Sequence, residues 1–158
     1  MAEQKGLPMI CFAASAGGHL EENLCLRSLR SSCPHFLITE EASGVEIDEN
    51  EKVVLIPQMK RGDVALPILM AKAFMQVARA FRLKNPDCVV STGALSTIPA
   101  MVLGHFFGAK VIYIESQART STLSLTGRFV YRFADLFIVQ WSSLERMVPG
   151  SVYRGMLS

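Results

Sequence analysis

The chain has 158 residues, of which half are hydrophobic and 19% are charged, and its formal net charge at pH 7 is +2. This length suffices for one domain with a core of its own, and so apolar a composition excludes an intrinsically disordered chain. The small net charge gives no electrostatic reason to expect a nucleic acid partner. We expect a single domain over residues 1–158, and the polar start of the chain does not predict a secretory signal.

Short apolar segments rich in Val and Ile recur along the chain and alternate with segments of helical period. Such strands are buried on both faces, which is typical of a parallel sheet covered by helices on each side. The sequence therefore predicts an α/β fold, a Rossmann-like doubly wound parallel sheet that binds ligands outside the carboxyl ends of its strands. The predicted strands are residues 9–14, 36–39, 53–56, 87–91, 109–114 and 136–140, and the predicted helices include 21–30 and 64–83.

A glycine turn follows the first predicted strand and precedes a helical pattern. Glycines let the backbone approach a ligand, and free N–H groups at a helix start favour an anion such as a phosphate. An imidazole at the rim of the turn can accept or donate a proton near neutral pH. The alternative is a turn that needs glycine only for its backbone dihedral angles. The residues concerned are Ser15, Gly17, Gly18 and His19.

Polar residues also follow the fourth and fifth predicted strands. Small hydroxyl residues around a glycine follow the fourth, and they can hold an anion or can simply cap the next helix. A carboxylate follows the fifth directly, at a place where packing alone rarely puts one. Because the carboxyl ends of parallel strands meet at one edge of a sheet, we expect these groups and the glycine turn to form a cleft. The residues are Thr92, Gly93, Ser96 and Thr97 after the fourth strand and Glu115 after the fifth.

The predicted helix over residues 64–83 is apolar almost all round, apart from a stripe of polar side chains. Its charges and one proline exclude a membrane-spanning segment. A helix that packs on a sheet needs a wide apolar face, and a helix that lies on an anionic bilayer needs apolar and basic residues together. Both interpretations can hold if one face packs and another inserts. The expected membrane contacts are Leu66, Leu69, Met70, Phe74 and Phe81, with Lys72 and Arg79.

The four cysteines form no CxxC pair. Cys11 and Cys88 lie in predicted strands, where a thiol usually serves as a small buried hydrophobe. This pattern predicts a reducing, cytoplasmic setting and no metal site, and nothing in the sequence calls for a cofactor. His105 lies among apolar residues, which favours a histidine of the core or of its edge over a ligand.

Four stretches together resemble the membrane-associating subunit of two-component GT-B-type glycosyltransferases. They are SAGGHLEE (15–22), STGALSTIPA (91–100), YIESQARTSTLSLTGRFVYRFADLFIVQW (113–141) and YRG (153–155). This family comprises the eukaryotic subunit that anchors the second GlcNAc transferase of dolichol-linked oligosaccharide synthesis, and bacterial capsule and exopolysaccharide proteins of the PssD and CpsF kind. The bacterial branch is expected to be closer, because the sequence has no N-terminal membrane helix.

The resemblance implies a division of labour between two chains. This chain is similar to the N-terminal, acceptor-side half of MurG, and a partner of the PssE or CpsG kind supplies the C-terminal half that binds the UDP-sugar. The implied acceptor is a polyprenyl-diphosphate-linked sugar, and the implied location is peripheral, on the cytoplasmic face of the membrane. The first MurG loop matches at Gly17, Gly18 and His19, whereas Ala94 and Leu95 depart from its second loop.

Roles for individual residues follow from this resemblance. The two glycine loops would hold the diphosphate, and either His19 or Glu115 would be the general base on the attacking hydroxyl. The apolar C-terminal tail has no further helix to cover it, so we expect it to contact the partner. One alternative is a non-catalytic membrane scaffold, and a dinucleotide-dependent oxidoreductase is disfavoured because the third glycine of GxGxxG is missing. The expected partner contacts are Trp141, Val152, Tyr153, Met156 and Leu157.

Overall fold

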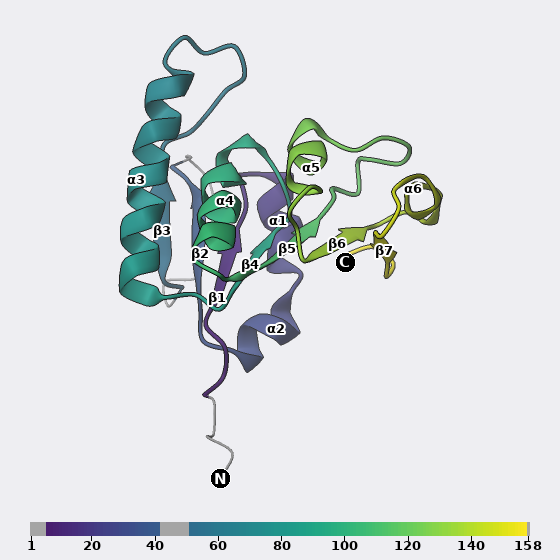
Figure 1. The fold of residues 1–158 in the computed structure, drawn as a ribbon, viewed down its shortest axis with the longest axis horizontal. Coiled ribbons are helices and arrows are strands. Elements are labelled where there is room, and N and C mark those ends of the chain that lie inside the picture. Colours follow the sequence, from purple (N-terminus) through teal and green to yellow (C-terminus); the bar gives the residue numbers. More distant parts are fainter. Residues whose placement is uncertain (1–5, 42–50, 158) are drawn as a thin grey trace.

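A computed structural model describes residues 6–41 and 51–157 of the chain, so most of the polar start lies outside the described residues. The strands form one parallel sheet in the order β3-β2-β1-β4-β5-β6-β7 (Figure 1). All six predicted strands are confirmed, and the fold class with them. The strands are β1 Ile10–Ala13, β2 His35–Glu40, β3 Val53–Ile56, β4 Cys88–Ser91, β5 Lys110–Ile114, β6 Leu136–Val139 and β7 Val152–Tyr153.

Helices cover both faces of the sheet. Buried side chains of α3, α4, α5 and α6 form the core on one face, and α1 and the residues around α2 pack on the other. Figure 1 shows α3 and α4 side by side on the first face, and the two helices are in contact. The helices are α1 Gly18–Leu24, α2 Arg27–Ser32, α3 Leu66–Lys84, α4 Ile98–Phe106, α5 Leu125–Val130 and α6 Ser142–Met147, with a 3-10 turn at Leu95–Thr97.

The single helix predicted over residues 21–30 is wrong, because α1 and α2 are separate. Leu26 has a ψ of 40°, which departs from helical geometry and interrupts the hydrogen-bond ladder. This turn lets Leu26 pack against the core cluster under α1. Tertiary packing therefore overrides the local helical period at this point.

The order of the strands places the topological switch between β1 and β4. The two strands are neighbours, and Ala13 lies beside Ser91 in the register. The connections after β1 and β4 leave in opposite directions from this point, which is where doubly wound sheets bind their ligands. The glycine turn after β1 and the hydroxyl-rich loop after β4 therefore start side by side.

Helix α3 presents one face to the core and one to the surroundings. Phe81 is only 1% exposed and lies edge-on to Phe36 in the core, so its predicted membrane contact is wrong. The period of the helix turns this residue inward together with Ala73 and Val77. Leu66, Leu69 and Met70 are half-buried against the same core, and Phe74 is half-buried as well.

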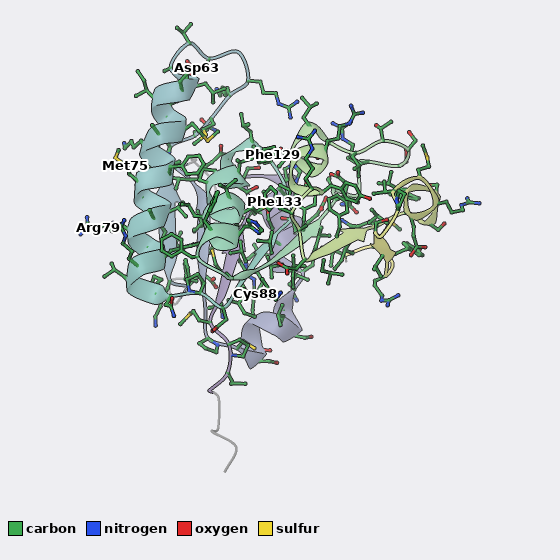
Figure 2. The ribbon with its side chains drawn as sticks, viewed as in Figure 1. Asp63, Met75, Arg79, Cys88, Phe129 and Phe133 are labelled. Carbon is green, nitrogen blue, oxygen red and sulfur yellow. The ribbon has the colours of Figure 1, made fainter. Side chains whose placement is uncertain are left out.

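The exposed face of α3 and the residues just before it form what we call the outer stripe. Apolar and basic side chains both lie along it at helical spacing. Figure 2 shows Met75 and Arg79 pointing away from the sheet. The apolar members are largely exposed, with Val64 at 96% and Ile68 at 73%. The outer stripe consists of Val64, Ile68, Lys72, Met75, Arg79 and Leu83.

Among the described residues the C-terminal tail has no further helix to cover it, but part of it packs on its own domain and is not free for a partner. Val152 belongs to β7, which pairs with β6. Leu157 packs against the core, and its N–H donates to Gln140 Oε1 at 2.8 Å. Tyr153 and Met156 are exposed. Only part of the predicted partner surface is therefore free within the described residues.

The cysteines in the sheet behave as small hydrophobes, as predicted. Cys11 is fully buried, and this burial raises the pKa of its thiol well above the ordinary value. Burial also raises the pKa of Cys88 to about 11. Both thiols are therefore protonated at neutral pH and poor nucleophiles. His105, by contrast, is exposed at the end of α4, so it lies at the edge of the core.

Candidate functional site

Two reciprocal hydrogen bonds join the glycine turn to the end of β4. His19 Nδ1 lies 2.9 Å from the carbonyl oxygen of Thr92, and the Thr92 hydroxyl donates to the carbonyl oxygen of His19 at 2.6 Å. A carbonyl can only accept, so the proton of the neutral imidazole resides on Nδ1. Nε2 is then left with its lone pair, and His19 is half-buried at the carboxyl edge of the sheet. This arrangement suits a general base.

The loop after β4 lies directly against this histidine. Gly93 has a φ of +108°, and a Cβ atom there would come within 3.3 Å of His19 Cε1 and 3.1 Å of the Tyr113 hydroxyl. Glycine is therefore needed both for the backbone angle and for the close approach. Ala94 follows with φ 84° and ψ 158°, a conformation that glycine alone adopts without strain. Ala94 thus departs from the second MurG loop in residue type, but its backbone keeps a conformation typical of glycine.

This strain predicts that Ala94→Gly stabilises the protein. A residue held in such a conformation costs about 1–3 kcal/mol. The extra flexibility of glycine in the unfolded chain offsets about 0.5–1 kcal/mol of that gain. We expect the free energy of unfolding in urea to rise by about 1 kcal/mol. Gly93→Ala is the matched change and should lower it, and a stability loss in Ala94→Gly would contradict the strain.

The hydroxyl groups that were predicted to hold an anion mostly form hydrogen bonds within the protein. Thr97 is buried, and its hydroxyl donates to the carbonyl oxygen of Ala94 at 2.8 Å. Ser15 and Ser96 are buried as well, and the Ser96 hydroxyl has no hydrogen-bond partner among the described residues. Thr92 and Thr97 therefore fix the loops that surround the site. Gly17 and Gly18 are exposed at the start of α1, beside His19.

Glu115 is 1% exposed and holds the connection between β5 and α5. Its Oε2 accepts hydrogen bonds from the N–H of Ser124 at 2.9 Å and from the Ser124 hydroxyl at 3.1 Å. Its Oε1 accepts from the N–H of Ser116 at 3.1 Å. Ser124 in turn caps α5 by accepting from the N–H of Gly127, whose missing Cβ leaves room for the carboxylate. Both carboxylate oxygens are therefore committed to the protein's own backbone.

A second buried carboxylate, Glu22, was missed by the sequence analysis. It lies one helical turn beyond His19, and its Oε1 accepts from the Ser116 hydroxyl at 3.0 Å. Its Oε2 accepts from Gln140 Nε2 at 3.0 Å, and the same amide nitrogen donates to the carbonyl oxygen of Glu115. Gln140 thus ties α1, the end of β5 and the C-terminal tail together. Gln140, a polar residue at the end of an apolar strand, is the signal in the sequence that could have found this cluster.

The site therefore lies at the ends of β1, β4, β5 and β6. The sequence analysis predicted that the ends of β1, β4 and β5 meet. Trp141 follows β6 and is half-buried, and its indole N–H donates to the carbonyl oxygen of Gln117 at 2.7 Å. Within the described ranges, 6–41 and 51–157, no helix has the length and apolarity needed to span a membrane.

Comparison with known families identifies the chain. The family described as "Oligosaccharide biosynthesis protein Alg14 like" matches residues 62–157, which is more than half of the sequence. The chain belongs to the Alg14 family. The human relative, named UDP-N-acetylglucosamine transferase subunit ALG14, is 29% identical over 94% of this chain and 82% of its own length. The resemblance to the eukaryotic anchoring subunit is thereby confirmed.

Solved structures support the predicted fold of this Alg14-family chain. It is similar to MurG from Acinetobacter baumannii with a TM-score of 0.72 and 18% identity, over 96% of this chain and 46% of MurG. It is also similar to UDP-N-acetylglucosamine 2-epimerase from Rickettsia bellii, with a TM-score of 0.68 and 10% identity over 95% and 45% of the two chains. The chain spans about half the length of both proteins. This half is therefore a fold that two different activities share.

Proposed function

We propose that this Alg14-family chain is the acceptor-side subunit of a two-chain glycosyltransferase. It forms one domain that holds a polyprenyl-diphosphate-linked sugar at the cytoplasmic face of a membrane, while a partner similar to the C-terminal half of MurG binds the UDP-sugar. The biosynthetic context is lipid-linked oligosaccharide synthesis or, if the chain is of the bacterial PssD and CpsF kind, capsule and exopolysaccharide synthesis. Family membership and the likeness to one half of MurG support this proposal.

The observation that carries the proposal is the reciprocal pair between His19 and Thr92. With its Nδ1 proton directed at a carbonyl oxygen, His19 would take the proton of the attacking sugar hydroxyl on Nε2. The glycines beside it, Gly17, Gly18 and Gly93, would let the backbone approach the diphosphate. The hydroxyl oxygen, freed of its proton, would then attack the anomeric carbon of the donor, and the nucleotide diphosphate would leave with the partner.

Glu115 serves this site as a positioning residue in our proposal. Its carboxylate accepts three hydrogen bonds from Ser116 and Ser124, and it is almost fully buried. A base needs access to the proton that it removes, and Glu115 does not have that access in this arrangement. Of the two candidates that the sequence left open, we therefore assign the chemistry to His19.

A scaffold without catalytic residues is the second candidate. It is favoured by the internal use of the Thr92 and Thr97 hydroxyls, which would otherwise be free to bind an acceptor. In that case the chain would only bring the donor-binding partner to the membrane. The His19 variant described in the Discussion separates the two functions.

Transfer of radiolabelled sugar to a lipid-linked acceptor tests the proposed function directly. Three preparations are compared: membranes that contain this chain alone, the partner alone, and both chains. We expect transfer only when both chains are present, since the described residues form a fold similar to one half of MurG. Equal transfer by the partner alone would contradict the proposal.

The tail and the residue after β6 are the proposed partner contacts. Tyr153 and Met156 would supply exposed side chains, and the half-buried Trp141 would add the part of its ring that is exposed. Val152 and Leu157 would act indirectly, by holding the tail against β6 and the core. Replacing exposed side chains is therefore a better test than truncation, which would also remove β7.

The outer stripe of α3 is the proposed membrane contact. Burial of a large apolar side chain in lipid contributes about 1.5–3 kcal/mol, and Lys72 and Arg79 would add attraction to anionic headgroups. We expect the double variant Ile68→Glu, Met75→Glu to lower the fraction bound to anionic vesicles at least about tenfold in sedimentation. Leu29→Glu is the matched control, because this exposed leucine lies on α2. Unchanged sedimentation of the double variant would contradict the contact.

A further inference from the structure

The side-chain amide of Gln140 lies at the junction of three parts of the molecule. Gln140 directly follows β6 and is 2% exposed. Its Nε2 donates two hydrogen bonds, one to Glu22 Oε2 and one to the carbonyl oxygen of Glu115, each at 3.0 Å. Its Oε1 accepts from the N–H of Leu157 at 2.8 Å. One buried side chain therefore joins helix α1, the end of β5 and the C-terminal tail.

These three partners require an amide at position 140. A planar amide carries two N–H donors and an accepting oxygen, and here all of them are used. The opposite orientation of the amide would place its oxygen against two accepting oxygens, so the network allows one orientation. A glutamate would keep the acceptor for the tail and lose both N–H donors, and a leucine would lose all three hydrogen bonds. Because the bonds of a buried network depend on one another, a change at one partner affects the other two.

Glu22 is the part of this network that belongs to the helix of the proposed base. It lies three residues after His19 and is 6% exposed. Its Oε1 accepts from the Ser116 hydroxyl at 3.0 Å and from the N–H of Gln117 at 3.3 Å. Helix α1 has only seven residues, and so short a helix is not stable through its own hydrogen bonds. The position of His19 therefore depends on the groups that hold Glu22.

The C-terminal tail is the least firmly held part of the network. Strand β7 has two residues and lies at the edge of the sheet, paired with β6. Beyond it, Leu157 donates its N–H to Gln140 and packs against the core cluster that contains Leu20 of α1. Tyr153 and Met156, the proposed partner contacts, are exposed on the same segment. A partner that binds the ordered tail stabilises it, and with it the hydrogen bonds of the Gln140 amide.

We propose that Gln140 is a positioning residue that couples the C-terminal tail to α1, so that a partner docked on the tail holds His19 in its working position. This inference rests on the proposed function, because it uses the proposed partner contacts and the role of His19 as base. The base is then held firmly only when the donor-binding chain is present. A shift of about 1 Å in a reacting group can lower a rate about 10²-fold, so a small movement of α1 suffices.

Exchanging the donor and the acceptor of one hydrogen bond tests the coupling in the complex of both chains. Gln140→Glu keeps the acceptor for the tail but places a second carboxylate against Glu22. We expect its turnover number at alkaline pH and saturating partner to be at least about tenfold below that of the wild type, with the KM of the acceptor unchanged. Relative to the wild type, the loss should become smaller as the pH falls, because a proton shared by the two carboxylates then replaces the amide donor.

The double variant Glu22→Gln, Gln140→Glu restores this hydrogen bond in reverse. The amide at position 22 then donates to the carboxylate at position 140. We expect this variant to recover most of the turnover of the wild type at alkaline pH. A turnover as low as that of Gln140→Glu alone would overturn the inference.

Hydrogen exchange followed by mass spectrometry tests the coupling without sugar transfer. We expect saturating partner to slow the exchange of a wild-type peptide over residues 18–26 at least about fivefold. Gln140→Leu removes all three hydrogen bonds of the amide and should lose this effect. Equal slowing in the wild type and in Gln140→Leu would show that the partner acts on α1 by another route, and no slowing in the wild type would show that it does not act on α1. Either result would make the inference wrong.

Val77→Ala is the matched control for a loss of stability. Val77 is fully buried on α3, away from the network of Gln140. Its replacement should lower the free energy of unfolding in urea but keep the turnover number and the effect of the partner on α1. Equal losses of turnover in Val77→Ala and Gln140→Leu would mean that Gln140 only stabilises the fold, which would also overturn the inference.

The two measurements separate this inference from the proposed function. If the partner slows exchange in α1 through Gln140 but the wild-type complex transfers no sugar, the transferase is refuted and the coupling is kept. If the wild-type complex transfers sugar and Gln140→Glu has full turnover at alkaline pH, the coupling is refuted and the transferase is kept.

Discussion

His19→Ala is expected to lower the rate of sugar transfer by about 10²- to 10⁴-fold, the usual contribution of a general base. The loss should fall on the turnover number at saturating acceptor, because the imidazole acts on the reacting hydroxyl and not on the lipid. The measurement is transfer of radiolabelled sugar by the complex of both chains. A scaffold would keep full activity in this variant, so the result also separates the two candidate functions.

Two further variants ensure that a loss in His19→Ala reports chemistry. Thr92→Val removes the hydroxyl that holds the first turn of α1 but keeps the carbonyl that orients His19, and we expect its turnover within about tenfold of the wild type. His35→Gln replaces a histidine at the opposite, amino end of β2, where it lies 3.3 Å from Glu51. Its turnover should be unchanged. Equal losses in His35→Gln and His19→Ala would contradict the role of His19.

Glu115→Ala is expected to lower the free energy of unfolding by about 3 kcal/mol, a large share of the 5–15 kcal/mol typical of a domain. The change leaves the N–H groups of the half-buried Ser116 and Ser124 without their acceptor. It also removes the group that holds the cap of α5. Unfolding in urea, followed by circular dichroism, measures the effect.

Glu115→Gln and Glu21→Ala complete this test. The amide keeps the shape of Glu115 and one accepting oxygen, so about half of the stability loss should remain. Glu21 is exposed in the first turn of α1, and its replacement should change stability by no more than about 0.5 kcal/mol. A fully stable Glu115→Gln protein that has lost sugar transfer would show that Glu115 is the base and that our assignment to His19 is wrong.

The site was partly predictable because its main signals are local. Glycine between a buried strand and a helical pattern predicts a βα turn. A histidine at the start of that helix is then predicted to lie at the turn. The contact between His19 and Thr92 follows from strand order, which sequence periodicity only suggests. Glu115 was singled out correctly as an unusual polar residue. Its three internal hydrogen bonds were not predictable, since its partners lie across the following loop.

Helix α3 shows where local pattern is insufficient. Helix α3 carries apolar side chains on all of its sides, so its composition cannot tell which of them pack in the core and which are exposed. Contact with the sheet and with α4 turns Phe81 inward and leaves Ile68 and Met75 outside. The same holds for the tail, where pairing with β6 converts a segment without helical or long apolar character into β7.

The sequence by itself determined the six main strands, the parallel α/β class and the two glycine loops, because hydrophobic period and glycine placement act over a few residues. Tertiary structure alone decided which side chains meet at the carboxyl edge of the sheet, which carboxylates accept hydrogen bonds from backbone N–H groups, and which apolar residues remain exposed. These outcomes depend on the order β3-β2-β1-β4-β5-β6-β7 and on helix packing, that is, on contacts between residues far apart in the chain. The contact between α4 and α5 is of this second kind, since the two helices come from separate segments of the chain.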